Sequence, residues 1–323
     1  MRLAITGLGV VSPFGVTRSA WQDALSGSDD AARANAFRAS EVVEGATTAE
    51  VWGFDPNEVL GPKGHRSFDR LTKYLIGAAK HALEDAGLKR DGAFVGPLTP
   101  EQLGICSATA YGSLDAITEL NRVAELEAPR YINPARFPNT VINAAAGYVS
   151  IWEDLRAPNT TIVDGNCGAL DAVLTAATHL HHRRGDGFLV GGGEVVSEPL
   201  YRALAKLGVL SMDGKPGVEM GEGASYVVVE RPDEAAARGA RVLGEFVGYG
   251  TAFEPPESEA LLVHASQEST ERAVGQALAE AGVDASDVDV VVAARCGLAE
   301  MDRAEDQGLK AALGEDVAVV GLK

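Results

Sequence analysis

The sequence predicts an α/β protein, because strand-like and helix-like segments alternate along almost its whole length. The 323 residues are 46% hydrophobic and 23% charged, which is enough to bury a large core in one domain or in two packed ones. Two segments also echo each other. "HALEDAG" at 81–87 and "QALAEAG" at 276–282 each end a helix and lead through a polar loop to a strand. This echo predicts a duplicated α/β unit.

The expected elements follow one another in a regular order. Residues 2–6 form a first strand that ends in a Gly-rich turn. Residues 67–87 form an amphipathic helix, because one stripe carries Leu71, Tyr74, Leu75, Ala78, Ala82 and Leu83. Further strands are expected over 103–107, 160–163, 187–192, 224–230, 287–294 and 316–322, and further helices over 111–126, 140–152, 167–183, 268–282 and 302–313. Helices placed between strands favour a mostly parallel sheet.

Composition and charge narrow the classes of partner. A formal net charge of −18 makes nucleic acid and anionic membrane surfaces poor partners. No apolar run approaches the roughly 20 residues of a membrane span, and the N-terminus has no basic leader. The cysteines Cys106, Cys167 and Cys296 are widely spaced and form no CxxC pair, so neither a disulfide framework nor structural zinc is expected. We therefore expect a cytoplasmic protein.

Three short motifs are weak. Gly7 and Gly9 follow a strand, but a dinucleotide fingerprint needs a third glycine where Ser12 stands, so a plain Gly turn is the better interpretation. The glycines of "GGGE" at 191–194 indicate close backbone packing after a strand. The histidines of "HLHHRR" at 179–184 end a helix, where neighbouring residues do not face each other. We therefore expect no cofactor and no metal.

Cys167 poses the central question of the sequence. It lies in "DGNCGALDA" at 164–172, between a predicted strand and a predicted helix, and a helix N-terminus lowers the pKa of a thiol. Cys167 could therefore be a nucleophile. The simpler hypothesis is that Cys167 is a small buried residue and that Asn166 caps the helix.

The chain as a whole resembles a known family. The segments "LAITGLGVVSPFG" at 3–15, "YINPARFPNTVINAAAGYVSIWEDLRAPNTTIV" at 131–163, "GALDAVLTAATHL" at 168–180 and "MGEGASYVVVERPDEAAARGAR" at 220–241 are similar, in this order, to the β-ketoacyl-ACP synthases of the thiolase superfamily. The resemblance implies a thiolase-like duplicated fold, layered α-β-α-β-α, with two five-stranded sheets. It divides the chain into an N-terminal half with insertions at 1–240 and a shortened, incomplete C-terminal half at 241–323.

The resemblance also places the catalytic positions. Active members carry a Cys in a T-A-C-x-S-G type motif and two histidines. Laid on that motif without a gap, Asn166 takes the nucleophile position and Cys167 falls one residue later. Counting back from the acidic start of the helix at 302–313 places Ala294 at the first histidine. Lys323 matches the lysine that precedes the second histidine, which would lie beyond it.

Loss of these groups implies a silent subunit. The family includes the chain length factors of type II polyketide synthases, which pair with an active ketosynthase α subunit. On this interpretation the protein has no activity of its own and shapes the acyl tunnel of a heterodimer in polyketide biosynthesis, with a polyene-type pathway slightly favoured. Acyl carrier protein would dock mainly on the partner, because Arg202, Lys206 and Lys215 form only a sparse basic cluster.

Four residues are candidates for the tunnel and the interface. Tyr111, Leu114 and Thr118 fall at i, i+3 and i+7 of the predicted helix, on one face. Phe137 lies in the loop before the next helix and approaches the same tunnel from the partner side. The alternative is that the three helix residues pack the core.

Three other functions stay open at this point. The first is an active condensing enzyme that uses Cys167, and the second is a starter-generating decarboxylase, which would still need the histidines. The third belongs to another class, a nucleotide-binding oxidoreductase based on Gly7 and Gly9.

Overall fold

The computed structural model describes residues 2–26, 29–212, 214–256, 258 and 264–321. Internal packing divides the chain into two compact units. The large unit comprises Leu3–Ala203 and Met220–Glu245, and the small unit comprises Leu204–Glu219 and the chain from Phe246 on, together with Arg2. No helix in the part of the chain described is both long and apolar enough to span a membrane.

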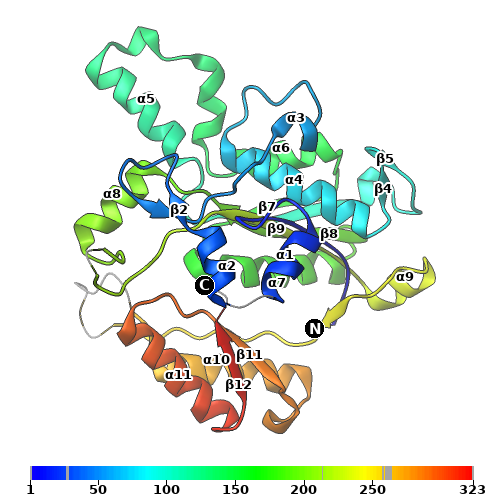
Figure 1. Ribbon diagram of the computed structural model, residues 1–323. Helices are drawn as coiled ribbons and strands as arrows, with labels where there is room; N and C mark the ends of the chain where they lie inside the picture. Colours follow the sequence, from blue (N-terminus) through cyan, green and yellow to red (C-terminus); the bar gives the residue numbers. More distant parts are fainter. Residues whose placement is uncertain (1, 27–28, 213, 257, 259–263, 322–323) are drawn as a thin grey trace. The chain divides into compact units, whose positions relative to one another are not determined.

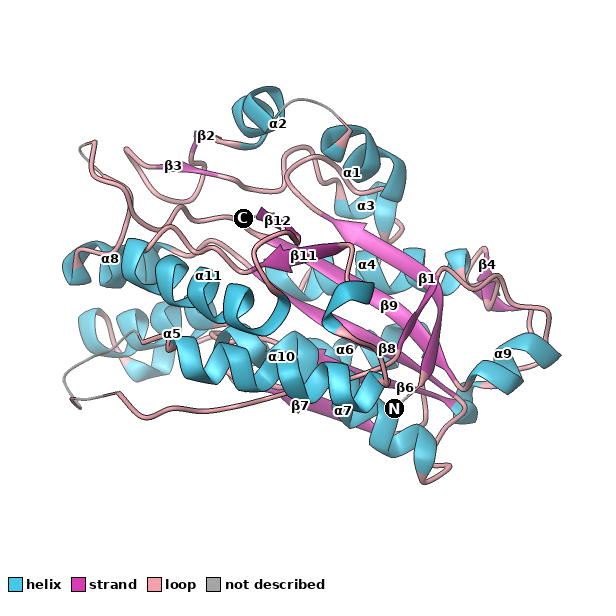
Figure 2. Ribbon diagram, turned by 90° about the horizontal axis from the view of Figure 1, so that it is seen from below, coloured by secondary structure: helices cyan, strands magenta, loops and turns pink. Residues whose placement is uncertain are grey.

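A six-stranded sheet forms the centre of the large unit (Figures 1 and 2). Its strand order is β10-β1-β9-β8-β6-β7, with bounds β1 (Leu3–Val11), β6 (Leu103–Ala108), β7 (Asn159–Ile162), β8 (Gly187–Glu194), β9 (Gly223–Glu230) and β10 (Gly244–Phe246). Strand β6 runs parallel to β7 and β8, whereas β9 is antiparallel to both β8 and β1. Strands β1, β6, β7 and β8 therefore run in one direction and β9 runs against them, so the expectation of a mostly parallel sheet missed only the antiparallel β9 among these five strands.

Helices cover both faces of this sheet. Helix α4 (Arg70–Asp85) packs with α6 (Ala144–Glu153) on one face, and α7 (Gly168–His181) lies on the other (Figure 1). The remaining elements along this part of the chain are α1 (Arg18–Leu25), α2 (Asp29–Ala36), α3 (Pro56–Val59), α5 (Leu114–Leu126), α8 (Glu198–Leu207) and α9 (Pro232–Ala237), with the short hairpins β2 (Arg38–Ala39) with β3 (Thr47–Thr48) and β4 (Lys89–Arg90) with β5 (Ala93–Phe94).

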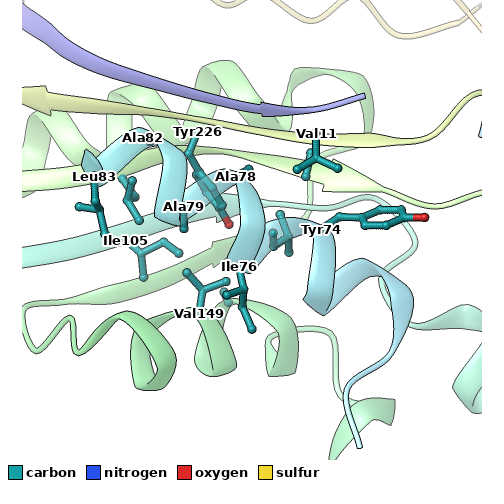
Figure 3. Close-up of a cluster of buried hydrophobic side chains, with 14 of the residues drawn as sticks. Val11, Tyr74, Ile76, Ala78, Ala79, Ala82, Leu83, Ile105, Val149 and Tyr226 are labelled. Atoms are coloured by element: carbon teal, nitrogen blue, oxygen red, sulfur yellow. The ribbon is translucent and has the colours of Figure 1, made fainter. Parts of the chain in front are cut away.

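The predicted stripe of α4 forms the centre of the core. All six of its residues are buried, and they pack with residues such as Val11, Ile105, Val149 and Tyr226 from the sheet and from α6 (Figure 3). Asp69 begins the helix by accepting a hydrogen bond from the backbone N–H of Thr72 at 2.8 Å. The amphipathic pattern therefore predicted both the helix and its buried face correctly.

The glycines of β1 explain how closely α4 approaches the sheet. A Cβ on Gly9 would lie 2.0 Å from the carbonyl oxygen of Ala78, and one on Gly7 would lie 2.3 Å from that of Ala82. Both glycines lie within β1, which continues to Val11, so the expected Gly turn after residue 6 is absent. Close helix packing, and not a nucleotide phosphate, is the structural reason for these glycines.

A buried carboxylate ties α4 to neighbouring strands and loops. Glu222 accepts hydrogen bonds from the backbone N–H of Val51 at 2.9 Å and of Val196 at 3.0 Å, and from the hydroxyl of Tyr74 at 3.0 Å. It also pairs with Arg70. Because every acceptor position is used, the charge is satisfied although the side chain is only 1% exposed.

Two helices and one parallel strand pair make up most of the regular structure described in the small unit. Helices α10 (Gln267–Ala281) and α11 (Ala299–Leu313) pack against each other, and β11 (Val290–Ala293) pairs with β12 (Ala318–Gly321). Ser266 begins α10 as its N-cap, and Gly282 ends it in the left-handed conformation. The resemblance implied a second sheet of five strands, but among the described residues this sheet has two.

Candidate active site

Three parallel strands of the large unit end at one edge of the sheet. The register pairs Ala108, the last residue of β6, with Ile162 at the end of β7 and with Gly192 near the end of β8. In open α/β sheets, ligands bind beyond the carboxyl ends of such strands. The loops that follow these three strands are therefore the candidate location of a ligand-binding or active site.

Cys167 lies at this edge, between β7 and α7. A single 3-10 turn, Gly165–Cys167, joins the two elements, and Gly165 takes a left-handed φ of 48°. Cys167 is the N-cap residue of α7, and Asn166 lies inside the turn. The prediction that Asn166 caps the helix was therefore wrong, because the 3-10 turn moves the start of α7 one residue further along the chain.

The Cys167 side chain is accessible. Cys167 is exposed, whereas Cys106 is buried in β6 and Cys296 is half-buried. The expectation that Cys167 is a small buried residue was therefore wrong. Burial raises the pKa of the Cys106 thiol to about 12, so that thiol is inert at neutral pH.

Partial burial and nearby negative charge disfavour the thiolate form of Cys167. Partial burial of the thiol, and then the negative charges of Asp164 and Asp171, raise the pKa of Cys167. A hydrogen bond to Asp171, followed by the charge of that residue, raises the pKa of Asp164 in turn. The N-terminus of the 14-residue α7 favours a thiolate, but the two carboxyl groups oppose it.

Glu194 connects two of the strand ends. It is the last residue of β8, and its Oε1 accepts hydrogen bonds from the Thr109 hydroxyl and from the backbone N–H groups of Ala110 and Tyr111. The carboxylate thereby holds the turn that follows β6. The glycines before it do pack closely, as predicted, since a Cβ on Gly192 would lie 2.1 Å from the carbonyl oxygen of Ala108.

The structure places Tyr111, one of the four proposed tunnel residues, outside the helix that was predicted to carry it. Tyr111 precedes α5, which begins at Leu114, so it does not share a helix face with Leu114 and Thr118. Tyr111 is 48% exposed and Phe137 is 64% exposed. Phe137 lies in the 3-10 segment Pro134–Thr140, which packs against α5.

Thr118 lines a cavity of about 510 Å³. The cavity lies between α5, the start of α4 and the 3-10 segment Pro134–Thr140, and its charged lining includes Asp115, Arg122 and Arg136. Tyr111, Leu114 and Phe137 are not among its lining residues.

Ala294 lies in the small unit, in the loop after β11. Glu305 accepts hydrogen bonds from the backbone N–H groups of Ala294 at 2.8 Å and Arg295 at 3.1 Å. Asp302 accepts one from Cys296 at 2.8 Å. The two acidic residues of α11 therefore hold the loop in which the sequence register placed Ala294. Lys323 lies outside the described residues.

The histidines at the end of α7 form no metal centre. His179 stacks on Phe188 with 5.4 Å between ring centroids, and His181 packs edge-on against His182. Within the described ranges, no group of three or more His, Cys, Asp or Glu residues is arranged to hold a metal ion.

Sequence reasoning missed the acidic groups around the site. Asp171 follows Cys167 by four residues, one helical turn, so helical spacing could have placed it beside the thiol. Asp164 could not have been found in this way, because it acts across the 3-10 turn. Glu194 was visible only as the end of a glycine run, and its three donors come from a loop more than 80 residues earlier.

Family models match almost the whole chain. Residues 1–235 match the model described as "Beta-ketoacyl synthase, N-terminal domain", and residues 243–322 match "Beta-ketoacyl synthase, C-terminal domain". The chain is 30% identical to "3-oxoacyl-[acyl-carrier-protein] synthase 2" of Coxiella burnetii over 97% of its own length and 78% of the relative's. It is 28% identical to the protein of the same name from Vibrio cholerae, with the same coverage.

Solved structures show the same fold. A β-ketoacyl synthase from Burkholderia phymatum superposes with a TM-score of 0.85 at 24% identity, covering all of this chain and 80% of that one. The structure titled "The ishigamide ketosynthase/chain length factor" gives 0.79 at 27% identity, covering 97% of this chain and 82% of that one. The thiolase-like ketosynthase fold implied by the resemblance is thereby confirmed.

These matches correct one expectation. The loss of the motif residues predicted a non-catalytic subunit, but the relatives named above, and further ones such as those of Vibrio harveyi and Rhizobium meliloti, are all named as synthases. The prediction that the protein is not an enzyme on its own is therefore contradicted. It rested on single motif positions, whereas the similarity extends along the whole chain.

Proposed function

Because the chain belongs to the β-ketoacyl synthase family, we propose that it is a condensing enzyme that makes 3-oxoacyl thioesters on acyl carrier protein. Cys167 is the residue that carries the acyl group in this proposal. The observation that supports it best is the position of an exposed thiol at the start of α7, beyond the carboxyl ends of β6, β7 and β8. The similarity to 3-oxoacyl-ACP synthases points to the same reaction class.

The first step is acyl transfer to the thiol. The Cys167 sulfur attacks the carbonyl carbon of an acyl thioester on the carrier protein, the bond from carbon to the carrier sulfur breaks, and that sulfur takes a proton. The products are an acyl-Cys167 thioester and the free carrier thiol. Since the thiolate is the attacking species and its pKa is raised, transfer should accelerate as the pH rises.

The second step forms the new carbon–carbon bond. A malonyl thioester on the carrier protein loses CO2, and the electron pair of the broken bond attacks the acyl carbonyl on Cys167. The Cys167 sulfur leaves with a proton, and the carrier protein holds a 3-oxoacyl group that is two carbons longer. We propose that the acyl group is a polyketide chain, because the sequence resembles the chain length factors of type II polyketide synthases and one similar structure is titled as a ketosynthase/chain length factor.

We also propose that the enzyme assembles through the open edge of β7. Strand β7 ends the sheet and pairs only with β6 in the described structure. Elements that contact β7 carry exposed apolar side chains, among them Ile151 of α6 and Leu170 of α7. Exposed edges and apolar surface favour pairing, and the structures of similar proteins include a ketosynthase/chain length factor. The partner is a second ketosynthase-family chain.

This function is tested by measuring the turnover of variants in which one cysteine is replaced by serine. The purified protein, with and without a co-expressed ketosynthase, is given acyl and malonyl carrier protein, and the 3-oxoacyl product is measured by mass spectrometry. Cys167→Ser should abolish product formation, whereas the control Cys296→Ser should retain it. Unchanged turnover by Cys167→Ser would remove Cys167 from the mechanism.

A further inference from the structure

We propose that the cavity between α5, the start of α4 and the segment Pro134–Thr140 binds a small ω-amino acid, with its ammonium group against Asp115 and its carboxylate against Arg136. This inference does not depend on the proposed condensing function, because it uses neither Cys167 nor the loops that follow β6, β7 and β8. It adds to the molecule a site for a ligand that has one positive and one negative end.

One face of α5 forms a wall of this cavity. Asp115, Thr118, Glu119 and Arg122 all line it, and spacings of three and four residues place them along one side of the helix. The residues that lead into α4, the first residues of α8 and the 3-10 segment supply the other walls, and all of them belong to the large unit. A volume of about 510 Å³ is typical of a site for a small molecule.

The end of the cavity at the first turn of α5 carries excess negative charge. Partial burial raises the pKa of the Asp115 carboxyl group, and Arg70 opposes this shift. The negative charges of Asp69 and Glu198 raise this pKa further. Asp69 caps α4 and Glu198 pairs with Arg202, whereas Asp115 makes no ion pair in the described part of the chain. An ammonium group at this end would give the Asp115 carboxylate the opposite charge that it lacks.

The next turn of α5 faces positive charge. Arg122 donates two hydrogen bonds to Glu119, each at 3.0 Å, so these two charges satisfy each other. The hydrogen bond from Arg122 lowers the pKa of Glu119 most, and the charge of Arg136 adds to this effect, which places Arg136 near this turn. Arg136 makes no ion pair among the described residues. Its guanidinium group is therefore left for an anion, and a carboxylate matches its planar fork.

The separation of the two ends selects the class of ligand. Asp115 and Glu119 are four residues apart on α5, and such positions are separated by about one helical turn. In an α-amino acid the ammonium and the carboxylate share one carbon atom, so they are too close to reach both ends. Three methylene groups, as in 4-aminobutanoate, hold the two charges far enough apart. Phe68, Ala116 and Pro199 also line the cavity and offer apolar surface to these methylene groups.

A buried polar side chain without a full set of partners lines the same cavity. Asn139 is 5% exposed, and its Nδ2 donates to the carbonyl oxygen of Ser67 at 2.8 Å. This bond holds Asn139 next to the start of α4, on the acidic side. Its Oδ1 has no hydrogen-bond partner within the described structure. Buried polar atoms are nearly always hydrogen-bonded, so this oxygen is an acceptor for a further N–H of the ammonium group, which carries three.

Isothermal titration calorimetry of the purified protein with four probes tests the site. 4-Aminobutanoate carries both charges, butanoate lacks the ammonium group, butylamine lacks the carboxylate, and glycine holds both charges on one carbon atom. Arg136→Gln and Asp115→Asn each remove one charge from an exposed residue. Arg130→Gln and Glu125→Gln are the matched controls, because these charged residues are also exposed but do not line the cavity.

Wild-type protein should bind one 4-aminobutanoate at least about tenfold more tightly than butanoate, butylamine or glycine, because only this probe makes both charged contacts. Arg136→Gln should weaken the binding of 4-aminobutanoate by about tenfold and leave that of butylamine within about twofold. Asp115→Asn should weaken 4-aminobutanoate to the same extent and leave butanoate within about twofold. Both control variants should match the wild type.

No heat of binding with 4-aminobutanoate at up to about 10 mM would overturn the site, and so would an equal loss of affinity in the control variants. Butanoate that binds as tightly as 4-aminobutanoate would indicate a simple anion site and contradict the role of Asp115. Glycine that binds equally well would contradict the assigned separation of the charges. If Arg136→Gln or Asp115→Asn does not fold, as judged by circular dichroism, the ranking of the four probes on wild-type protein decides.

Discussion

Partial burial and two neighbouring carboxyl groups reduce the reactivity of the Cys167 thiol. Partial burial of the thiol, and then the charges of Asp164 and Asp171, raise the pKa of Cys167, so at pH 7 to 9 a smaller fraction is thiolate than for an ordinary cysteine. The rate of iodoacetamide labelling should therefore still rise with pH above 9. A labelling rate that levels off below pH 8 would contradict this electrostatic account.

Removing one of these charges should activate the thiol. Asp171→Asn keeps the shape of the side chain but removes its negative charge, which lowers the pKa of Cys167. Labelling at pH 8 should become about three- to tenfold faster, as expected for a decrease of half a pKa unit to one unit. Asp233→Asn, on the distant helix α9, should leave the labelling rate unchanged, and an equal effect of both variants would point to net charge as the cause.

Tyr111 should be replaceable at little cost to stability. Because the side chain is 48% exposed, Tyr111→Ala should lower the free energy of unfolding by less than about 1 kcal/mol. Denaturation by urea measures this change. A loss of 2 kcal/mol or more, within the range of about 2–5 kcal/mol for buried large-to-small substitutions, would return Tyr111 to the core and weaken its predicted role at the acyl tunnel.

Residue-level prediction worked where chemistry is local to the sequence. It placed Cys167 at the start of a helix, as the structure does, although the family register gave the nucleophile position to Asn166. The acidic residues of α11 served only to count back to Ala294, and the structure shows that they also hold that loop. Residue-level prediction missed the exposure of Cys167 because burial depends on the packing around a 3-10 turn that has no clear sequence signal. Glu194 was missed because its partners are distant in sequence.

At the scale of elements, the contact of β1 with α4 gives a direct test. Gly9→Ala would place a methyl group 2.0 Å from the carbonyl oxygen of Ala78, so strand and helix would have to move apart. We expect a loss of about 1–3 kcal/mol or more in the free energy of unfolding.

Gly147→Ala is the matched control for that substitution. Gly147 lies within α6, and a Cβ there meets no atom within 4 Å. This variant should gain about 0.4–1 kcal/mol, because alanine favours a helix and restricts the unfolded chain. Equal urea midpoints for the two variants would show that β1 and α4 are not packed as closely as described.

Strongly periodic elements were predicted well, and irregular boundaries were not. The apolar stripe of α4 predicted correctly that this segment is a helix and which of its faces is buried. Helix α5 begins three residues later than predicted. Gly112 and Ser113 lie in a turn that is held by hydrogen bonds to Thr109 and Asp69, although the apolar pattern continues through this turn. The glycines of β1 suggested a turn, since a sequence pattern does not show that a helix approaches a strand at that point.

At the scale of the whole molecule, the open edge of β7 predicts an assembly. The Ile105 N–H donates to Pro158, and the Thr109 N–H donates to Ile162, so alternate residues of β7 face β6 and the N–H of Thr161 faces the open edge. Thr161→Pro removes that donor without breaking a bond to β6. It should convert a dimer into a folded monomer, as measured by light scattering after size exclusion.

Thr161→Val is the control for this prediction, because it keeps the N–H group and should remain dimeric. An interface of this kind is expected to bury more than about 2,000 Å² in total. A wild-type protein that is a stable monomer alone and with a co-expressed ketosynthase would contradict the proposed assembly.

At this scale the sequence predicted some features of the molecule correctly and others wrongly. The family resemblance predicted the thiolase-like fold, and models of its two domains match the chain. The same resemblance led to a wrong conclusion on activity, because three motif positions were given more weight than the full length. The mixed order of the sheet could not be foreseen either, since strand direction depends on which distant strands pair.

Trapping the acyl-enzyme tests the central claim most directly. The protein is mixed with a carrier protein bearing a medium-length acyl thioester, quenched with acid, digested and analysed by mass spectrometry. The account predicts that the acyl mass appears on the peptide that contains Cys167, that it is absent from Cys167→Ser, and that hydroxylamine removes it, as expected for a thioester. An acyl group on another residue, or none on wild-type protein that labels readily with iodoacetamide at Cys167, would contradict the claim that this thiol carries the substrate.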